Sequence, residues 1–139
     1  MAPSGDVPPL TRDELRETRC LPQPDGGALT PAAIARQLTA LPDWSPADGA
    51  LERDFVFRDY AATIRFVVSV AAMAEDEDHH PELRVGYGRC SVRWNTHSVG
   101  GISRNDFICA LRTDDLYDRQ RAASAPGVDA SSGGAEQSS

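Results

Sequence analysis

The stretch from Tyr60 to Glu75 constrains the fold most, because its apolar residues cover more than one side of a predicted helix. Asp59, directly before it, is a good N-cap. One apolar stripe consists of Tyr60, Ile64, Val67, Val68 and Ala71, and a second consists of Phe66, Val70 and Met73. A helix with two apolar stripes needs two partners, so we expect a sheet on one side and another helix or subunit on the other.

Apolar and polar residues alternate before and after this helix in the sequence, which predicts strands. From Leu51 to Phe57, apolar side chains lie on one side of the predicted strand and charged ones on the other, which is typical of a half-buried strand. Residues 83 to 96 alternate on both sides of Gly88-Arg89, which can turn, so they predict a β-hairpin. A further short strand would fit near Trp44 or in the tail of the hairpin region.

Two more helices are predicted from their start signals. Thr30 is an N-cap followed by Pro31 at the first helical position, and Ser103 is an N-cap for the last helix. Helically spaced apolar residues follow, namely Ile34, Leu38 and Leu41 in the first helix and Phe107, Ala110 and Leu111 in the second. The element order places helices on one face of an antiparallel sheet, the arrangement of an α+β domain.

The two ends differ in composition from the domain, which we place at residues 29–118. Residues 1–28 are rich in Pro and Gly and predict an arm, with one short helix starting at Thr11, where Glu14 could complete a capping box. Residues 119–139 are rich in Ser, Gly and Ala and predict a disordered tail.

Composition argues against several partners. With 14 Lys and Arg against 21 Asp and Glu, the formal net charge is -7, so we expect no nucleic-acid partner. The longest mostly apolar stretch, residues 64–74, is about half of the roughly 20 residues that a membrane span needs, so we expect no membrane. The three cysteines form no C-x-x-C pair and the N-terminus has no leader pattern, so we expect reduced thiols and a cytoplasmic protein.

All three histidines lie in one stretch, as His79-His80-Pro81 and then His97. A hairpin can return its far end beside its beginning, so the three imidazoles could converge. The unperturbed pKa of histidine is about 6.5, so a proton donor and acceptor could be assembled there at neutral pH. Pro81 drives His80 towards an extended backbone, in which neighbouring side chains point to opposite faces, so His79 and His80 should have different roles.

Other interpretations of the same region stay open. A His-His pair in a loop is usually a solvated turn, and residues 75–78 are most simply a solvated acidic helix end. Asp106 can complete a capping box with Ser103, and Tyr87 can pack on the sheet or form a wall for a flat ring. Adjacent histidines rarely both chelate one ion and no H-E-x-x-H motif occurs, so we expect no metal.

The combined spacing of these residues resembles the pterin-4a-carbinolamine dehydratase family. The motif runs Glu75, three residues, His79-His80-Pro81, five residues, Tyr87, nine residues, His97, eight residues and Asp106. The segments LTALPDW (38–44) and THSVGGI (96–102) are also similar to family sequence, and the resemblance covers residues 29–117.

The resemblance implies a four-stranded antiparallel sheet with about three helices on one face, in subunits that pair as homodimers or homotetramers. It also implies the loss of water from a 4a-hydroxytetrahydropterin to give a quinonoid dihydropterin. This reaction regenerates the tetrahydrobiopterin cofactor of aromatic amino acid hydroxylases. The pterin is then the substrate, and no cofactor is expected.

The resemblance further implies roles for individual residues. It assigns His79 and His97 to proton transfer, and His80 with Pro81 to shaping the pocket and contacting the ring. The other implied substrate-binding residues are Asp78, Glu75, Tyr87, Thr96 and Asp106.

Two departures from the family pattern concern the edge of the pocket. Leu83 stands where relatives often carry an aromatic residue, and Asn105 stands where they often carry Arg. The same site could therefore serve another dehydration or cyclisation in specialised metabolism. A binding or dimerisation partner without catalysis is the third interpretation.

Overall fold

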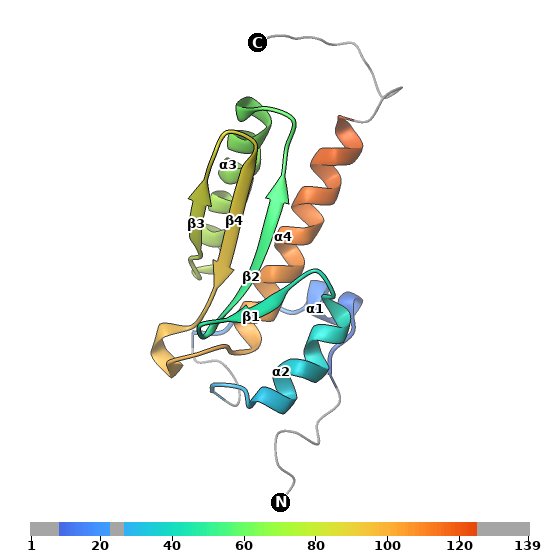
Figure 1. Ribbon diagram of the computed structural model, residues 1–139. Coiled ribbons are helices and arrows are strands. Elements are labelled where there is room, and N and C mark those ends of the chain that lie inside the picture. The colour runs from blue at the N-terminus through green and yellow to red at the C-terminus, as the bar shows by residue number, and fades with distance from the viewer. Residues whose placement is uncertain (1–8, 23–26, 125–139) are drawn as a thin grey trace, which may run out of the picture.

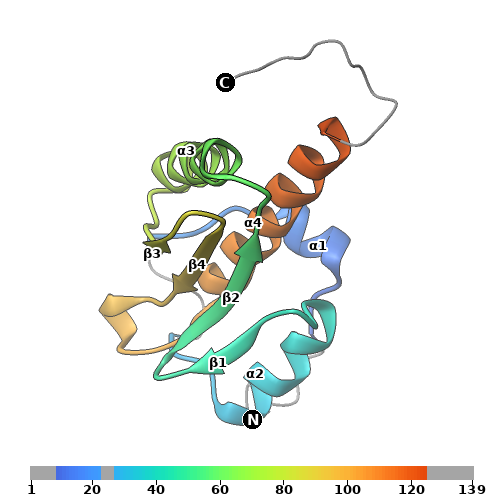
Figure 2. The same cartoon turned by 45° about the horizontal axis from the view of Figure 1, so that its top comes forward.

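The computed structural model describes residues 9–22 and 27–124. Its strands form one antiparallel sheet in the order β1-β2-β4-β3. The strands are β1 (Ser45–Ala47), β2 (Ala50–Val56), β3 (Glu82–Val85) and β4 (Arg89–Trp94). The helices are α1 (Arg12–Glu17), α2 (Pro31–Gln37), α3 (Tyr60–Glu77) and α4 (Arg104–Ala123), with 3-10 turns η2 (Leu38–Ala40) and η3 (His97–Val99). Figures 1 and 2 show α3 and α4 on the same side of the sheet, so the predicted four-stranded α+β fold is confirmed.

The predicted hairpin is formed by β3 and β4, with Leu83 opposite Val92. Its turn requires glycine at position 88, because a Cβ there would lie 2.8 Å from the carbonyl oxygen of Phe57. The further short strand is β1, which directly follows Trp44 and pairs with the start of β2.

Side-chain caps begin the helices where the sequence predicts them. The Asp59 side chain accepts a hydrogen bond from the backbone N–H of Ala62 at the start of α3. Ser103 and Asp106 form a complete capping box at the start of α4. These contacts satisfy N–H groups that have no partner within the helix.

The core lies between the sheet and the two long helices. β2 contributes Phe55 and β4 contributes Trp94, while α3 contributes Phe66 and α4 contributes Phe107, and all four side chains are buried. The Phe55 and Phe66 rings lie 4.8 Å apart between centroids. Burying a side chain of this size stabilises the fold by about 1.5–3 kcal/mol, so these aromatic residues fix α3 and α4 against the sheet.

The two apolar stripes of α3 have different environments. Phe66 and Val70 are fully buried against the sheet, whereas Tyr60 is 52% and Val68 is 61% exposed. α3 also contacts α4, so the sheet and a second helix, the two expected kinds of partner, both lie within the part of the chain that the structure describes. Tyr60 and Val68 stay exposed within that part.

The opposite face of the sheet is charged. On this outer face, Arg93 of β4 lies between Glu52 of β2 and Glu82 of β3, and it forms an ion pair with each. On the same face, Arg89 of β4 forms an ion pair with Asp54 of β2. Alternation along each strand thus separates a buried inner face from a polar outer face.

Part of the expected arm packs on the domain. The short helix at Thr11 is α1, with the capping box to Glu14. Leu15 is fully buried in the core, and Arg16 forms an ion pair with Asp115 of α4 at 2.7 Å. Residues 9–22 are thus held against α4 rather than extending as a flexible segment, and residues 1–8 and 23–26 lie outside the described residues.

The last helix is longer than the sequence suggested. We expected a disordered tail from residue 119, but α4 continues to Ala123, and residues 125–139 lie outside the described residues. The reason is that Tyr117 and Gln120 anchor this end, donating hydrogen bonds to the backbone carbonyls of Val56 and Ala62. Within the described ranges, none of the helices is both long and apolar enough to cross a membrane.

Candidate active site

α3 ends, β3 begins, β4 ends and α4 begins at the same end of the sheet (Figure 1). His79 and His80 lie between α3 and β3, and His97 lies between β4 and α4. Asp78 closes α3 in the left-handed conformation, with a φ of 53°. The backbone N–H of His79 then donates to the carbonyl of Ala74 at 3.1 Å. This closure turns the chain back towards the sheet and fixes the direction in which the next side chains point.

His80 and His97 line the same small pocket. Its volume is about 160 Å³, and its lining residues are Ala50, His80, Pro81, Glu82, Arg93, Asn95 and His97. Typical ligand sites measure roughly 300–1,000 Å³, so this pocket can enclose only part of a small molecule. The structure thus brings two of the three predicted imidazoles together.

His79 is the third imidazole, and it lies on the inner side. Its ring stacks on Trp94 at 5.5 Å between centroids and 15° between planes. Its Nε2 lies 2.7 Å from Oδ1 of Asp106, and its side chain is only 12% exposed. His79 is not among the residues that line the small pocket.

Asp106 links the inner histidine to the start of α4. The residue is fully buried, and its Oδ2 accepts hydrogen bonds from the Thr96 hydroxyl and the backbone N–H of Ser103, both at 2.8 Å. The contact suits the His79 tautomer that carries its proton on Nε2, because a carboxylate oxygen accepts. The capping box and the orientation of His79 therefore depend on the same carboxylate.

His80 has a carboxylate partner of its own on the outside. Its Nε2 lies 2.7 Å from Oε2 of Glu75, and the two side chains are 55% and 78% exposed. Because Glu75 occupies Nε2, the other ring nitrogen of His80 is the one left for a ligand. Both members of the dipeptide are thus oriented by a carboxylate, but in opposite environments.

The remaining predicted residues fall in different places. Thr96 is buried and contacts Asp106 and Ser103 rather than the pocket. Asp78 is exposed and does not line the pocket. Tyr87 sits at the far turn of the hairpin, 70% exposed and stacked on Tyr60 at 6.5 Å between centroids. Within one chain the structure does not bring Tyr87 to the histidines, because the length of β3 separates it from Pro81.

Four lining residues were not predicted from the sequence: Ala50, Glu82, Arg93 and Asn95. The register of the hairpin is the signal that could have found the charged pair. A turn at residues 86–88 sets Glu82, next to Pro81, opposite Arg93.

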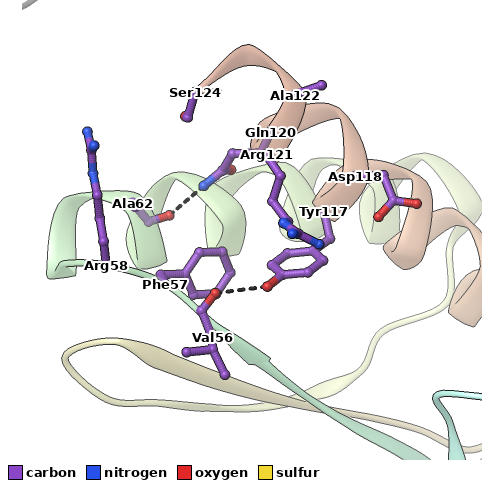
Figure 3. Close-up of a pocket in the computed structure, with 10 residues that line it drawn as sticks. All are labelled: Val56, Phe57, Arg58, Ala62, Tyr117, Asp118, Gln120, Arg121, Ala122 and Ser124. Atoms are coloured by element: carbon purple, nitrogen blue, oxygen red, sulfur yellow. Dashed lines mark hydrogen bonds between the residues drawn. The ribbon is translucent and has the colours of Figure 1, made fainter. Parts of the chain in front are cut away.

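A larger cavity of about 560 Å³ lies at the opposite end of the sheet, beside the end of β2 and the last turns of α4 (Figure 3). The Tyr117 hydroxyl and the Gln120 amide there are bonded to backbone carbonyls, and no histidine lines this cavity. No cluster of three or more His, Cys, Asp or Glu suited to a metal occurs in residues 9–22 and 27–124. Of these two cavities, only the small pocket is lined by histidines.

The chain is similar to known proteins over most of its length. The family model for pterin 4 alpha carbinolamine dehydratase matches residues 27–116. A protein of Stenotrophomonas maltophilia named pterin-4-alpha-carbinolamine dehydratase is 45% identical over 108 residues, covering 76% of this chain and 93% of the relative. A protein of the same name from Bdellovibrio bacteriovorus is 50% identical over 99 residues, covering 68% of this chain and 82% of the relative.

A solved structure agrees with these relatives. The crystal structure of a transcriptional coactivator/pterin dehydratase from Brucella melitensis superposes with a TM-score of 0.62 at 33% identity, covering 65% of this chain and 98% of that one. The fold and these matches define a hydro-lyase family. The chain belongs to the pterin-4a-carbinolamine dehydratase family, as its motif spacing indicated.

Proposed function

We propose that the protein eliminates water from a 4a-hydroxytetrahydropterin, giving a quinonoid dihydropterin, in the pocket between His80 and His97. The observation that carries this proposal is that two imidazoles line one small cavity. Family membership supports the substrate class. The pterin is the substrate, and the proposed reaction uses no further cofactor.

The reaction needs two proton transfers, which two imidazoles can perform. One imidazolium protonates the 4a-hydroxyl, so that the C–O bond breaks and water leaves. A neutral imidazole takes the proton from the adjacent ring nitrogen, whose electrons form the new double bond. Histidine exchanges protons near neutral pH, and general acid-base help of this kind contributes about 10² to 10⁴ in rate.

The environment of His79 supports a different role from the one that the family motif implied. A ring stacked on Trp94 and bonded to Asp106 is held in place, and only a small part of it is exposed. We infer that His79 is a positioning residue that fixes the backbone of His80. Proton transfer then rests on His80 and His97.

The direct test is an assay of 4a-hydroxytetrahydropterin dehydration with wild-type protein and with His80→Ala, His97→Ala and His79→Ala. We expect turnover by the wild type and large losses in the first two variants. Ser98→Ala is the matched control, because Ser98 is an exposed neighbour of His97 outside the pocket lining.

Other outcomes identify the alternatives. Wild type without pterin turnover but with a bound non-pterin ligand in the pocket would indicate another dehydration or cyclisation. A partner-binding role is motivated by the coactivator title of the Brucella structure. Partner binding that persists in all three histidine variants, without turnover by the wild type, would indicate that role.

We further infer that the protein forms homodimers or homotetramers through an exposed apolar surface on α3 and the end of the β3–β4 hairpin. Tyr60, Val68, Val85 and Tyr87 are large apolar residues that are between 40% and 70% exposed. Burial in a second subunit would remove this surface from water.

Light scattering should give a dimer or tetramer for the wild type and a smaller species for Val68→Glu, with exposed Arg65→Ala as the control. A wild-type monomer at all concentrations would contradict this inference.

The three cysteines are free thiols, a state that fits the cytoplasmic location we propose.

A further inference from the structure

Arg93 lines the same cavity as His80 and His97, and it is the only Lys or Arg among the lining residues. We propose that Arg93 binds the substrate by donating a hydrogen bond to the ring carbonyl oxygen of the pterin. This inference rests on the proposed function and adds a binding residue to it. Arg93 lies outside the motif that relates the chain to its family.

The position of the guanidinium is fixed from both sides. Arg93 is on the central strand β4, and its Nη1 donates to Oε1 of Glu52 on β2 at 3.0 Å. Its Nε lies 3.3 Å from Oε1 of Glu82 on β3. These two carboxylates engage Nη1 and Nε, so Nη2 is the terminal nitrogen that remains. A guanidinium held in this way loses little freedom when a ligand binds.

The local charge favours a neutral acceptor. One guanidinium faces two carboxylates, so these three side chains together carry a net negative charge. Such a group does not attract an anion, but a planar N–H donor can still bond a carbonyl oxygen.

Substrate chemistry identifies which carbonyl. In a 4a-hydroxypterin, the ring carbonyl carbon is bonded directly to the carbon that loses its hydroxyl. A pocket of about 160 Å³ holds only the region around the reacting carbon, and the ring carbonyl is the neutral acceptor in that region.

The kinetic consequence follows from the chemistry of this acceptor. The carbonyl is present in both substrate and product, so a hydrogen bond to it stabilises all states similarly. Loss of the bond should therefore raise KM and leave kcat close to the wild-type value. A residue that only supports the sheet would not produce this split.

The test compares Arg93→Met with Arg89→Met. Arg89 lies on the same face of β4 and pairs with Asp54, but it does not line the pocket. For Arg93→Met we expect KM for the 4a-hydroxypterin, and Kd for unsubstituted pterin by fluorescence titration, to rise about 10- to 100-fold. Arg93→Lys keeps the charge and a folded protein, and it should raise both values by about tenfold, because an ammonium lacks the planar fork. Arg89→Met should change neither.

The possible outcomes show whether Arg93 binds the substrate. Wild-type KM and Kd in both Arg93 variants, with wild-type turnover intact, would overturn the role of Arg93 and leave the proposed function standing. Equal rises in Arg93→Met and Arg89→Met would also overturn it, because the effect would then belong to the whole charged face. A wild-type protein that neither turns over the 4a-hydroxypterin nor binds pterin would overturn the proposed function and this inference with it.

Discussion

His79 and His80 are neighbours in the chain but belong to different regions of the molecule. His79 points inward, where it stacks on Trp94 and bonds to the fully buried Asp106. His80 points outward, where it bonds to exposed Glu75 and lines the pocket with His97. The dipeptide therefore joins the core to the candidate site: one ring anchors the segment, and the other is accessible to a ligand.

A buried residue next to an outward-facing one also occurs at the other end of β4. Cys90 is fully buried, and this burial raises the pKa of its thiol to about 11. Its neighbour Ser91 faces outward and donates to Asp54, and this hydrogen bond, with help from Arg89, holds the pKa of Asp54 below its usual value. Cys90 and Ser91, adjacent on β4, therefore lie in opposite environments, one buried and apolar and the other polar.

The largest expected effect separates the two histidines. His80→Ala and His97→Ala should each lower kcat/KM by about 10² to 10⁴, because each removes one of the two imidazoles that we propose transfer protons. Their melting temperatures should stay near that of the wild type, because both side chains are exposed. His79→Ala should lower stability by about 1–3 kcal/mol, since it leaves Oδ1 of buried Asp106 without its partner.

Steady-state kinetics and urea unfolding of the same three proteins check this contrast. A larger loss of activity in His79→Ala than in His80→Ala and His97→Ala, with unfolding at the same urea concentration as the wild type, would contradict this difference in roles.

A smaller effect is expected at the carboxylate behind His79. Asp106→Asn keeps the shape but weakens the hydrogen bonds to His79, Thr96 and the backbone of Ser103. We expect a stability loss of about 1–2 kcal/mol and a fall in kcat/KM of about tenfold. Thr96→Val is the matched control, because it removes a hydrogen bond to Asp106 without touching His79. Wild-type unfolding and kinetics in Asp106→Asn would show that the buried carboxylate does not position the site.

The smallest effect concerns the outer face. The pKa of Asp54 is lowered on folding, mainly by the Ser91 hydroxyl, from an ordinary value of 3.8. The unfolded chain therefore takes up this proton at a higher pH than the folded protein does. Stability from Asp54 is present above about pH 4 and is lost as the pH falls through the lower folded pKa. The side chain is 39% exposed, so water screening keeps the contribution below about 1 kcal/mol.

Urea unfolding of wild type and Asp54→Asn at pH 6 and pH 3 measures this contribution. The wild type should be slightly more stable at pH 6, and the difference should shrink at pH 3. A difference that is equal at both pH values would contradict the shift, and exposed Asp118→Asn is the control.

The sequence predicts most of the elements because their signals are local. The caps at Asp59 and Ser103 and the alternation of the hairpin each depend on residues close in the chain, and each element forms where expected. The docking of α1 was not predictable in this way. Leu15 is buried by contacts with α4, roughly a hundred residues away in sequence, and proline-rich composition carries no information about such contacts.

The candidate site was predicted in part for the same reason. Spacing along the chain identified His80, Pro81 and His97, which line one pocket. It could not decide that His79 faces the core, because that depends on the position of Trp94. It also did not identify Arg93, whose place in the pocket depends on strand register.

An NMR titration of the imidazole Cε1–H signals with a pterin tests directly whether His80 and His97 form the pterin pocket. The chain contains only three histidines, so each signal can be assigned from a single His→Ala variant. We predict that the signals of His80 and His97 shift on saturation with 7,8-dihydropterin, while that of His79, stacked on Trp94, moves little. A large shift of His79 with no change in His80 and His97 would show that the pterin binds elsewhere.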